Sequence, residues 1–111
     1  DQENKAKLGG DDLTVDIERV GTRPAAQGNK NAALVQRAIA ATLAMGVEPS
    51  LAIASTDANL PISIGIPAVT MSRGGISGRA HALDEWWQDE NAYISVQIGI
   101  LTLLAEAGLA D

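Results

Sequence analysis

The spacing of apolar residues along the chain predicts alternating strands and helices. Leu13, Val15 and Ile17 alternate with polar residues, which is the period of a half-buried strand. From Asn31 the apolar positions follow a helical period that ends at Gly46. Two short apolar runs, at 51–54 and 68–71, are typical of buried strands, and a short helix is expected at 58–64 between them.

The remaining sequence divides into an irregular stretch and a final helix. Residues 72–90 show no periodicity, and a long stretch of this kind in a compact domain is often functional. In the last helix Ser95, Gly99, Thr102 and Glu106 form a narrow polar stripe, so that helix is expected to be largely buried. The order of elements predicts an α/β fold with a largely parallel sheet and covering helices, in which the polar turns at 55–57 and after Met71 lie at the carboxyl ends of strands.

Composition narrows the possible functions. The 111 residues carry a formal net charge of −6 and only 3% aromatic residues, which argues against binding to nucleic acid or to an anionic membrane. The absence of cysteine excludes disulfides and thiol chemistry. No apolar run has the length of a membrane span, and no signal-peptide layout is present. We therefore expect neither nucleic acid nor membrane as a partner.

Three features could carry chemistry, and each also has a purely structural interpretation. His81, the single histidine, is either a solvated loop residue or a metal ligand or general acid/base. Asp57 is either a helix N-cap or a carboxylate that organises a site. The cluster Gly74, Gly75 and Gly78, flanked by Arg73 and Arg79, is either a tight turn or a seat for an anion. Trp86 and Trp87 are expected to be one buried anchor and one partly exposed ring. A serine hydrolase is disfavoured because no GxSxG motif occurs.

Taken together, residues 55–87 resemble the C-terminal catalytic segment of the cocatalytic-zinc peptidase and amidohydrolase family, which includes peptidase T, aminoacylase, acetylornithine deacetylase, succinyl-diaminopimelate desuccinylase and glutamate carboxypeptidases. The matching features are TDA at 56–58, GIPA at 65–68, the glycine-rich loop and HALDE at 81–85. From about Leu13 the chain resembles, more weakly, the last strand of the lid (dimerisation) domain. The resemblance thus divides the chain into a lid remnant at 1–22 and a catalytic part at 23–111.

The resemblance implies that His81 is a zinc ligand and that Gly74, Gly75, Gly78 and Asp57 line the substrate site. Ala82 and Arg79 depart from the residues usual in the family. The family's other ligands and its general-base glutamate precede the lid, so the chain is expected to be a fragment without catalytic residues of its own. The implied parent is a cytoplasmic homodimer that holds two zinc ions per active site and hydrolyses amide bonds of peptides or N-acyl amino acids; the isolated chain is expected to be inactive and to bind no zinc. The alternative is a small non-enzymatic α/β module that binds an anionic ligand or a protein partner, for example by pairing of the 13–20 strand.

Overall fold

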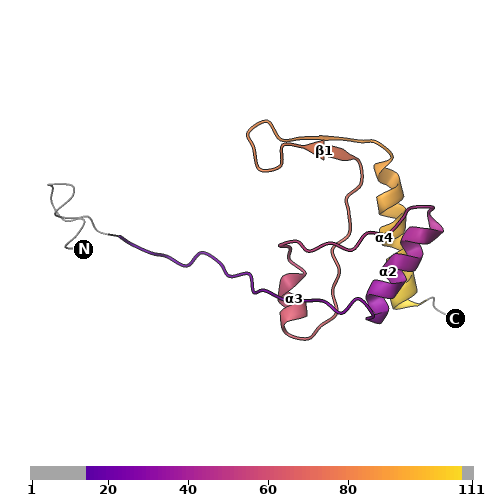
Figure 1. Cartoon of the computed structure of the whole chain (residues 1–111), viewed down its shortest axis with the longest axis horizontal. Helices are drawn as coiled ribbons and strands as arrows, with labels where there is room; N and C mark the ends of the chain where they lie inside the picture. The colour runs from indigo at the N-terminus through magenta and orange to yellow at the C-terminus, as the bar shows by residue number, and fades with distance from the viewer. Residues whose placement is uncertain (1–14, 109–111) are drawn as a thin grey trace.

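Three helices and one β-hairpin form the regular structure of residues 15–108, the part of the chain that the computed structural model describes. The helices are α2 (Ala33–Ala44), α3 (Asn59–Ser63) and α4 (Ala92–Ala107), and the strands are β1 (Ile76–Gly78) and β2 (Trp86–Gln88) (Figure 1). The predicted mixture of helix and strand is confirmed, as are the three predicted helices. No helix in this part of the chain is long and apolar enough to cross a membrane.

Helix α2 forms where the sequence predicts it and ends for the predicted reason. Its sequence, ALVQRAIAATLA, contains neither glycine nor proline and is rich in alanine, the best helix former. Gly46 follows with a φ of +72°, and its N–H donates to the carbonyl oxygen of Leu43 over 2.9 Å. A left-handed glycine of this kind satisfies the carbonyl groups that a helix end leaves without partners.

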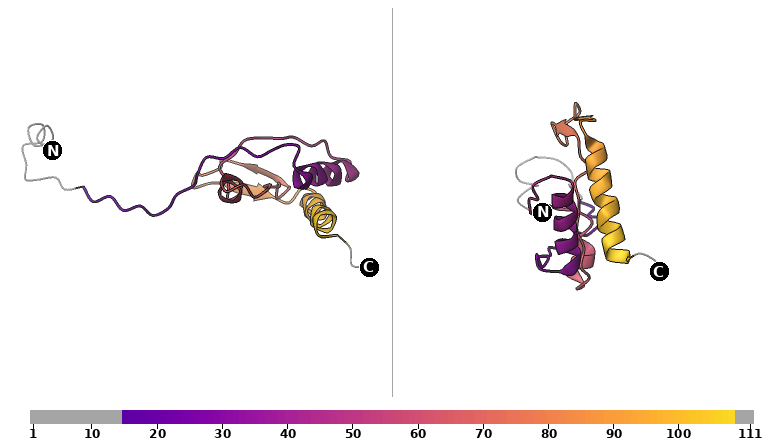
Figure 2. Two further views of the ribbon diagram at one scale, coloured as in Figure 1. Left: turned by 90° about the horizontal axis from the view of Figure 1, so that it is seen from below. Right: turned by 90° about the vertical axis from the view of Figure 1, so that its right-hand side faces the viewer.

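The small core of the molecule lies between α2 and α4, which run side by side (Figure 2). Ala38 and Ala41 of α2 face Ile98 and Thr102 of α4, and all four are at least 93% buried. The Thr102 hydroxyl donates to the carbonyl oxygen of Ile98 over 2.8 Å, so this buried polar group has a partner. Small side chains allow the two helices to approach closely.

The prediction that α4 is largely buried is wrong. The helix turns its small and polar stripe inward: Ser95 and Gly99 are partly buried, and Thr102 is only 5% exposed. Six of its large apolar side chains remain 38–66% exposed, namely Tyr93, Val96, Ile100, Leu101, Leu103 and Leu104, whereas Ile98 is buried. A single contact with α2 covers only one side of the helix, around Ile98 and Thr102, so the side chains on its other side stay exposed.

None of the three predicted strands forms within residues 15–108. Residues 51–54 and 68–71 have no regular structure, and neither has 15–20; the first two residues of the predicted 13–20 strand lie outside the described part. A strand requires backbone hydrogen bonds to an adjacent segment, and none of these segments makes one; Thr70 reaches Thr56 only through a bond of 2.8 Å between their hydroxyls. The apolar side chains of 15–20 and 51–54 are accordingly exposed, Ile53 completely, while those of 68–71 are half-buried. The predicted parallel sheet is therefore not found here.

The observed sheet lies instead in the stretch that showed no periodicity. Strands β1 and β2 pair antiparallel, with Ile76 opposite Gln88 and Gly78 opposite Trp86. The hairpin leads directly into α4 (Figure 1). Residues 15–24 form an arm whose first part extends away from the rest, while Arg23 and Pro24 contact the segment that leads into α3. The hairpin and α3 therefore position the candidate site residues.

Candidate functional site

His81 lies in the connection between β1 and β2 and has an unusual backbone conformation. Its φ is +66°, a left-handed value that few residues other than glycine adopt. The His81 backbone N–H donates to Glu85 Oε2 over 3.1 Å. The side chain is exposed, and no hydrogen bond or ion pair to its imidazole occurs within residues 15–108. The loop thus fixes the backbone of His81 and leaves both ring nitrogens available.

An ion pair also stabilises the connection between β1 and β2. Arg79, also left-handed with a φ of +58°, donates from Nε to Asp84 Oδ1 over 2.6 Å. Two backbone hydrogen bonds of 3.0 Å stabilise the same connection. The Ala82 N–H donates to the Arg79 carbonyl, and the Glu85 N–H donates to the Ala82 carbonyl. Because Asp84 neutralises Arg79, only Arg73 of the two flanking arginines is outside an ion pair among the described residues.

The glycines predicted to line a substrate site are packed against the two tryptophans. A Cβ on Gly78 would lie 2.7 Å from the Trp86 indole nitrogen, and one on Gly75 would lie 2.5 Å from the Gln88 carbonyl oxygen. The Gly74 carbonyl accepts a hydrogen bond of 2.9 Å from Trp87 Nε1. Absence of side chains at these positions therefore lets the indole rings cover β1. Both tryptophan residues are 45% exposed, so the prediction of one buried anchor and one partly exposed ring is wrong.

Gly74 also joins the hairpin to α4. A Cβ at this position would lie 2.7 Å from the Ser95 hydroxyl oxygen and 2.8 Å from the Ala92 Cα. Its φ of +72° and this close approach both require glycine. Hairpin and helix are consequently fixed to each other next to the stretch that carries His81.

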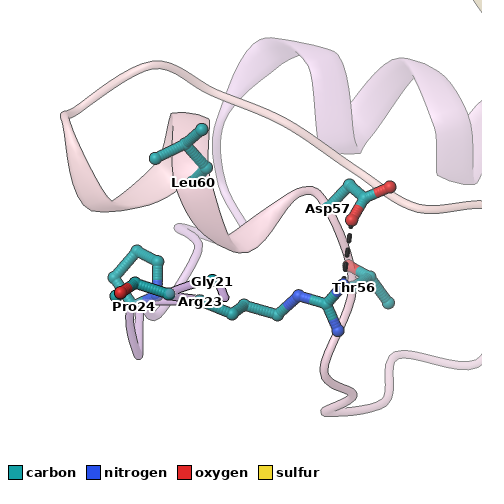
Figure 3. A pocket seen from close by; sticks show the side chains of 7 residues that line it. Gly21, Arg23, Pro24, Thr56, Asp57 and Leu60 are labelled. Atoms are coloured by element: carbon teal, nitrogen blue, oxygen red, sulfur yellow. Dashed lines mark hydrogen bonds and ion pairs between the residues drawn. The ribbon is translucent and has the colours of Figure 1, made fainter. Parts of the chain in front are cut away.

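Asp57 does not cap α3, contrary to the N-cap interpretation. The residue at the cap is Ala58, without a side-chain hydrogen bond, and the Thr56 N–H is satisfied by Asn59 Oδ1 over 3.0 Å. The Asp57 carboxylate instead accepts a hydrogen bond of 3.0 Å from Arg23 (Figure 3). The same guanidinium donates to the carbonyl and hydroxyl oxygens of Ser55, over 3.3 and 3.1 Å.

The pair of Arg23 and Asp57 borders a shallow hollow of about 460 Å³. It is lined by the arm and by the turn before α3: Gly21, Thr22, Arg23, Pro24, Thr56, Asp57 and Leu60 (Figure 3). Sequence reasoning did not identify Arg23, because its partner lies 34 residues further along the chain. An arginine next to a proline in a linker-like segment is the only signal that the sequence offers.

The structure does not bring the predicted site residues together. Asp57 lies beside α3 and His81 in the hairpin connection, which Figure 1 shows well apart. Within residues 15–108 there is no group of three or more His, Cys, Asp or Glu side chains that could hold a metal ion. Of the two acidic neighbours of His81, Asp84 binds Arg79 and Glu85 binds the His81 N–H. Since a zinc site takes about three or four protein ligands, these residues alone do not fit one.

Comparison of the sequence with models of protein families and with curated proteins gave no match.

Proposed function

We propose that the chain is the C-terminal catalytic segment of a zinc-dependent peptidase or amidohydrolase, in which His81 supplies one metal ligand. The parent enzyme hydrolyses the amide bond of a peptide or an N-acyl amino acid. The observation that carries the proposal is the presentation of His81: a fixed backbone in a braced loop, with an exposed and uncommitted imidazole.

The left-handed backbone of His81 supports a functional role because it is maintained at a cost. Such a conformation disfavours residues with a Cβ by about 1 kcal/mol or more. Strained backbone of this kind concentrates at binding and catalytic sites, where the surrounding contacts hold it. Here the contacts are the Glu85 carboxylate and the pair of Arg79 and Asp84. In a loop that served only as a connection, glycine at position 81 would adopt this positive φ at a lower conformational free energy.

The finer features of the fold belong to the same proposal. In the parent, residues 51–54 and 68–71 are strands of a largely parallel sheet, and 1–22 is the end of a lid domain. The other zinc ligands and the general base come from segments outside these 111 residues, so the isolated chain is inactive. Two zinc ions per site, a homodimer and a cytoplasmic location follow from the family resemblance alone. The complete exposure of Ile53 supports the sheet, because a strand of that sheet would bury it.

The test uses the protein encoded together with its upstream sequence, assayed for zinc content and for hydrolysis of dipeptides and N-acetyl amino acids. His81→Asn is the informative variant, since asparagine tolerates left-handed backbone but does not replace imidazole as a zinc ligand. We expect it to lose about half of the bound zinc and to lower kcat at least ~100-fold.

The matched control is Leu83→Ala, at a fully exposed position in the same loop. It is expected to keep both zinc and activity. Retention of zinc and turnover in His81→Asn would refute the role of His81, and absence of any amidase activity in the intact protein would refute the enzyme class.

A further inference from the structure

Residues 15–22 of the arm have the structural features of a protease substrate. All of them are exposed, and Val15, Ile17 and Val20 are 78–93% exposed. Their backbone groups form no hydrogen bond to any residue within 15–108, and the segment runs extended away from the helices (Figure 1). An endopeptidase binds its substrate as an extended chain, through backbone groups on both sides of the cleaved bond. This stretch can therefore enter a protease cleft without prior unfolding.

Arg19 lies near the middle of this stretch. Arginine is recognised by proteases whose specificity pocket contains a carboxylate. We propose that the peptide bond between Arg19 and Val20 is a limited-proteolysis site for an arginine-specific endopeptidase. Hydrolysis of this bond consumes one water molecule, and it leaves a new carboxylate on Arg19 and a new amino group on Val20.

The second arginine of the arm is not an alternative site. Arg23 precedes Pro24, which lacks an N–H and has a fixed φ, so the chain after this bond cannot form the backbone contacts that a protease requires. The Arg23 guanidinium also donates to Ser55 and Asp57 over 3.0–3.3 Å. It would have to leave both partners before it could enter a specificity pocket.

The other three arginines of the chain lie in folded elements. Arg37 is inside α2, and Arg79 is held in the connection between β1 and β2 by its ion pair to Asp84. Arg73 precedes Gly74, which is packed against α4. A bond in a folded element is cut in proportion to the time that the element spends open. These three sites are therefore cut more slowly than the bond after Arg19, which is always accessible.

Cleavage after Arg19 removes the outer part of the arm and leaves the folded part intact. The contacts of Arg23 with Ser55 and Asp57, and the packing of α2 against α4, involve no residue before position 23. The fragment 20–111 is therefore expected to keep its helices. The cut lies three residues before the boundary that the family resemblance implies, so it removes most of the lid remnant and none of the catalytic part. The inference depends on neither zinc nor the proposed activity.

The test exposes the 111-residue chain, under native conditions, to a small amount of an endopeptidase that cuts only after arginine, and follows the intact masses over time. We expect the fragments 1–19 and 20–111 to appear first, at a rate at least ~10-fold above that at any other arginine. Arg19→Gln is expected to abolish this pair of fragments. The control Arg79→Gln makes the same change at another exposed arginine and is expected to leave the pair unaltered.

Matched peptides separate the effect of structure from that of the local sequence. Residues 15–22, 33–40 and 75–82 give three peptides of equal length, each with one arginine at the same position. Because short free peptides lack the folded elements, the 15–22 peptide is expected to lose its advantage over the other two. A first cut at another arginine of the native chain would overturn the proposal. It would also be overturned by an equal preference for the 15–22 peptide, or by loss of the helix signal at 222 nm in fragment 20–111.

Discussion

Substitution of Gly75 by alanine tests whether the glycine-rich segment is built for the tryptophans. Gly75 has a φ of +69°, and an added Cβ would lie 2.5 Å from the Gln88 carbonyl oxygen and 2.7 Å from Trp87 Nε1. The conformation costs alanine about 1–2 kcal/mol, and overpacking against backbone adds about 1–3 kcal/mol. A hairpin with three-residue strands is only marginally stable, so this sum exceeds what its pairing provides.

We therefore expect Gly75→Ala to open the hairpin while α2 and α4 persist. The assay is amide hydrogen exchange at residues 76–78 and 86–88, together with the NMR shift of the Trp87 indole N–H, which donates to the Gly74 carbonyl. Protection at these amides should fall to that of unfolded chain, and the indole signal should move to its position in free solution.

Two other glycines separate the causes of this loss. Gly46 has a φ of +72° but nothing within 4 Å of an added Cβ, so Gly46→Ala isolates the backbone cost of about 1–2 kcal/mol. Gly21 has an ordinary φ and open space, so Gly21→Ala should change nothing. Neither is expected to affect the hairpin. Native hydrogen exchange and an unchanged indole shift in Gly75→Ala would refute the packing argument.

Three further predictions address the helix pair, the ion pair and the loop. Thr102→Leu should destabilise the contact between α2 and α4 by about 1–3 kcal/mol, measured by urea unfolding at 222 nm, because leucine does not fit between the helices. Arg23→Ala should leave unfolding unchanged, since Asp57 is fully exposed, but should shift the NMR signals of residues 55–57. At position 81, valine should cost about 1–2 kcal/mol in thermal unfolding and asparagine almost nothing, because only valine resists a positive φ.

The helices could be predicted from the sequence because their signals are local. Apolar spacing and a terminal glycine define α2 within about fifteen residues, and the structure confirms them. A strand is different, since its hydrogen bonds go to another part of the chain. The apolar run at 51–54 has the composition of a strand but no backbone hydrogen-bond partner among the described residues, and it stays irregular. The hairpin could not be predicted from periodicity because its strands do not alternate apolar and polar residues. They are held together by packing of glycine against tryptophan.

For the candidate site, the sequence indicates which residues to consider but not their conformations or partners. The sequence singles out His81 because it is the only histidine, but the positive φ and the bond to Glu85 are properties of the folded turn. For Asp57 the sequence favoured a local role as an N-cap, whereas the observed partner is Arg23, on the distant arm. The local sequence indicates that Asp57 could cap a helix, but it does not show that folding brings Arg23 close enough to bind the carboxylate instead.

The two halves of the candidate site differ in how strongly the described residues determine them. The loop that presents His81 is held by contacts within residues 74–88, namely the glycine–tryptophan packing, the pair of Arg79 and Asp84 and the Glu85 carboxylate, and by the packing of Gly74 on α4. Asp57 depends on an exposed ion pair to an arm that is otherwise held by the bonds of Arg23 to Ser55 and by the bond of Asn59 to the Pro24 carbonyl. Exposed pairs hold their groups weakly. Completion of a sheet around 51–54 should therefore reorient Asp57 and leave the His81 loop unchanged, which makes His81 the residue on which the zinc hypothesis depends.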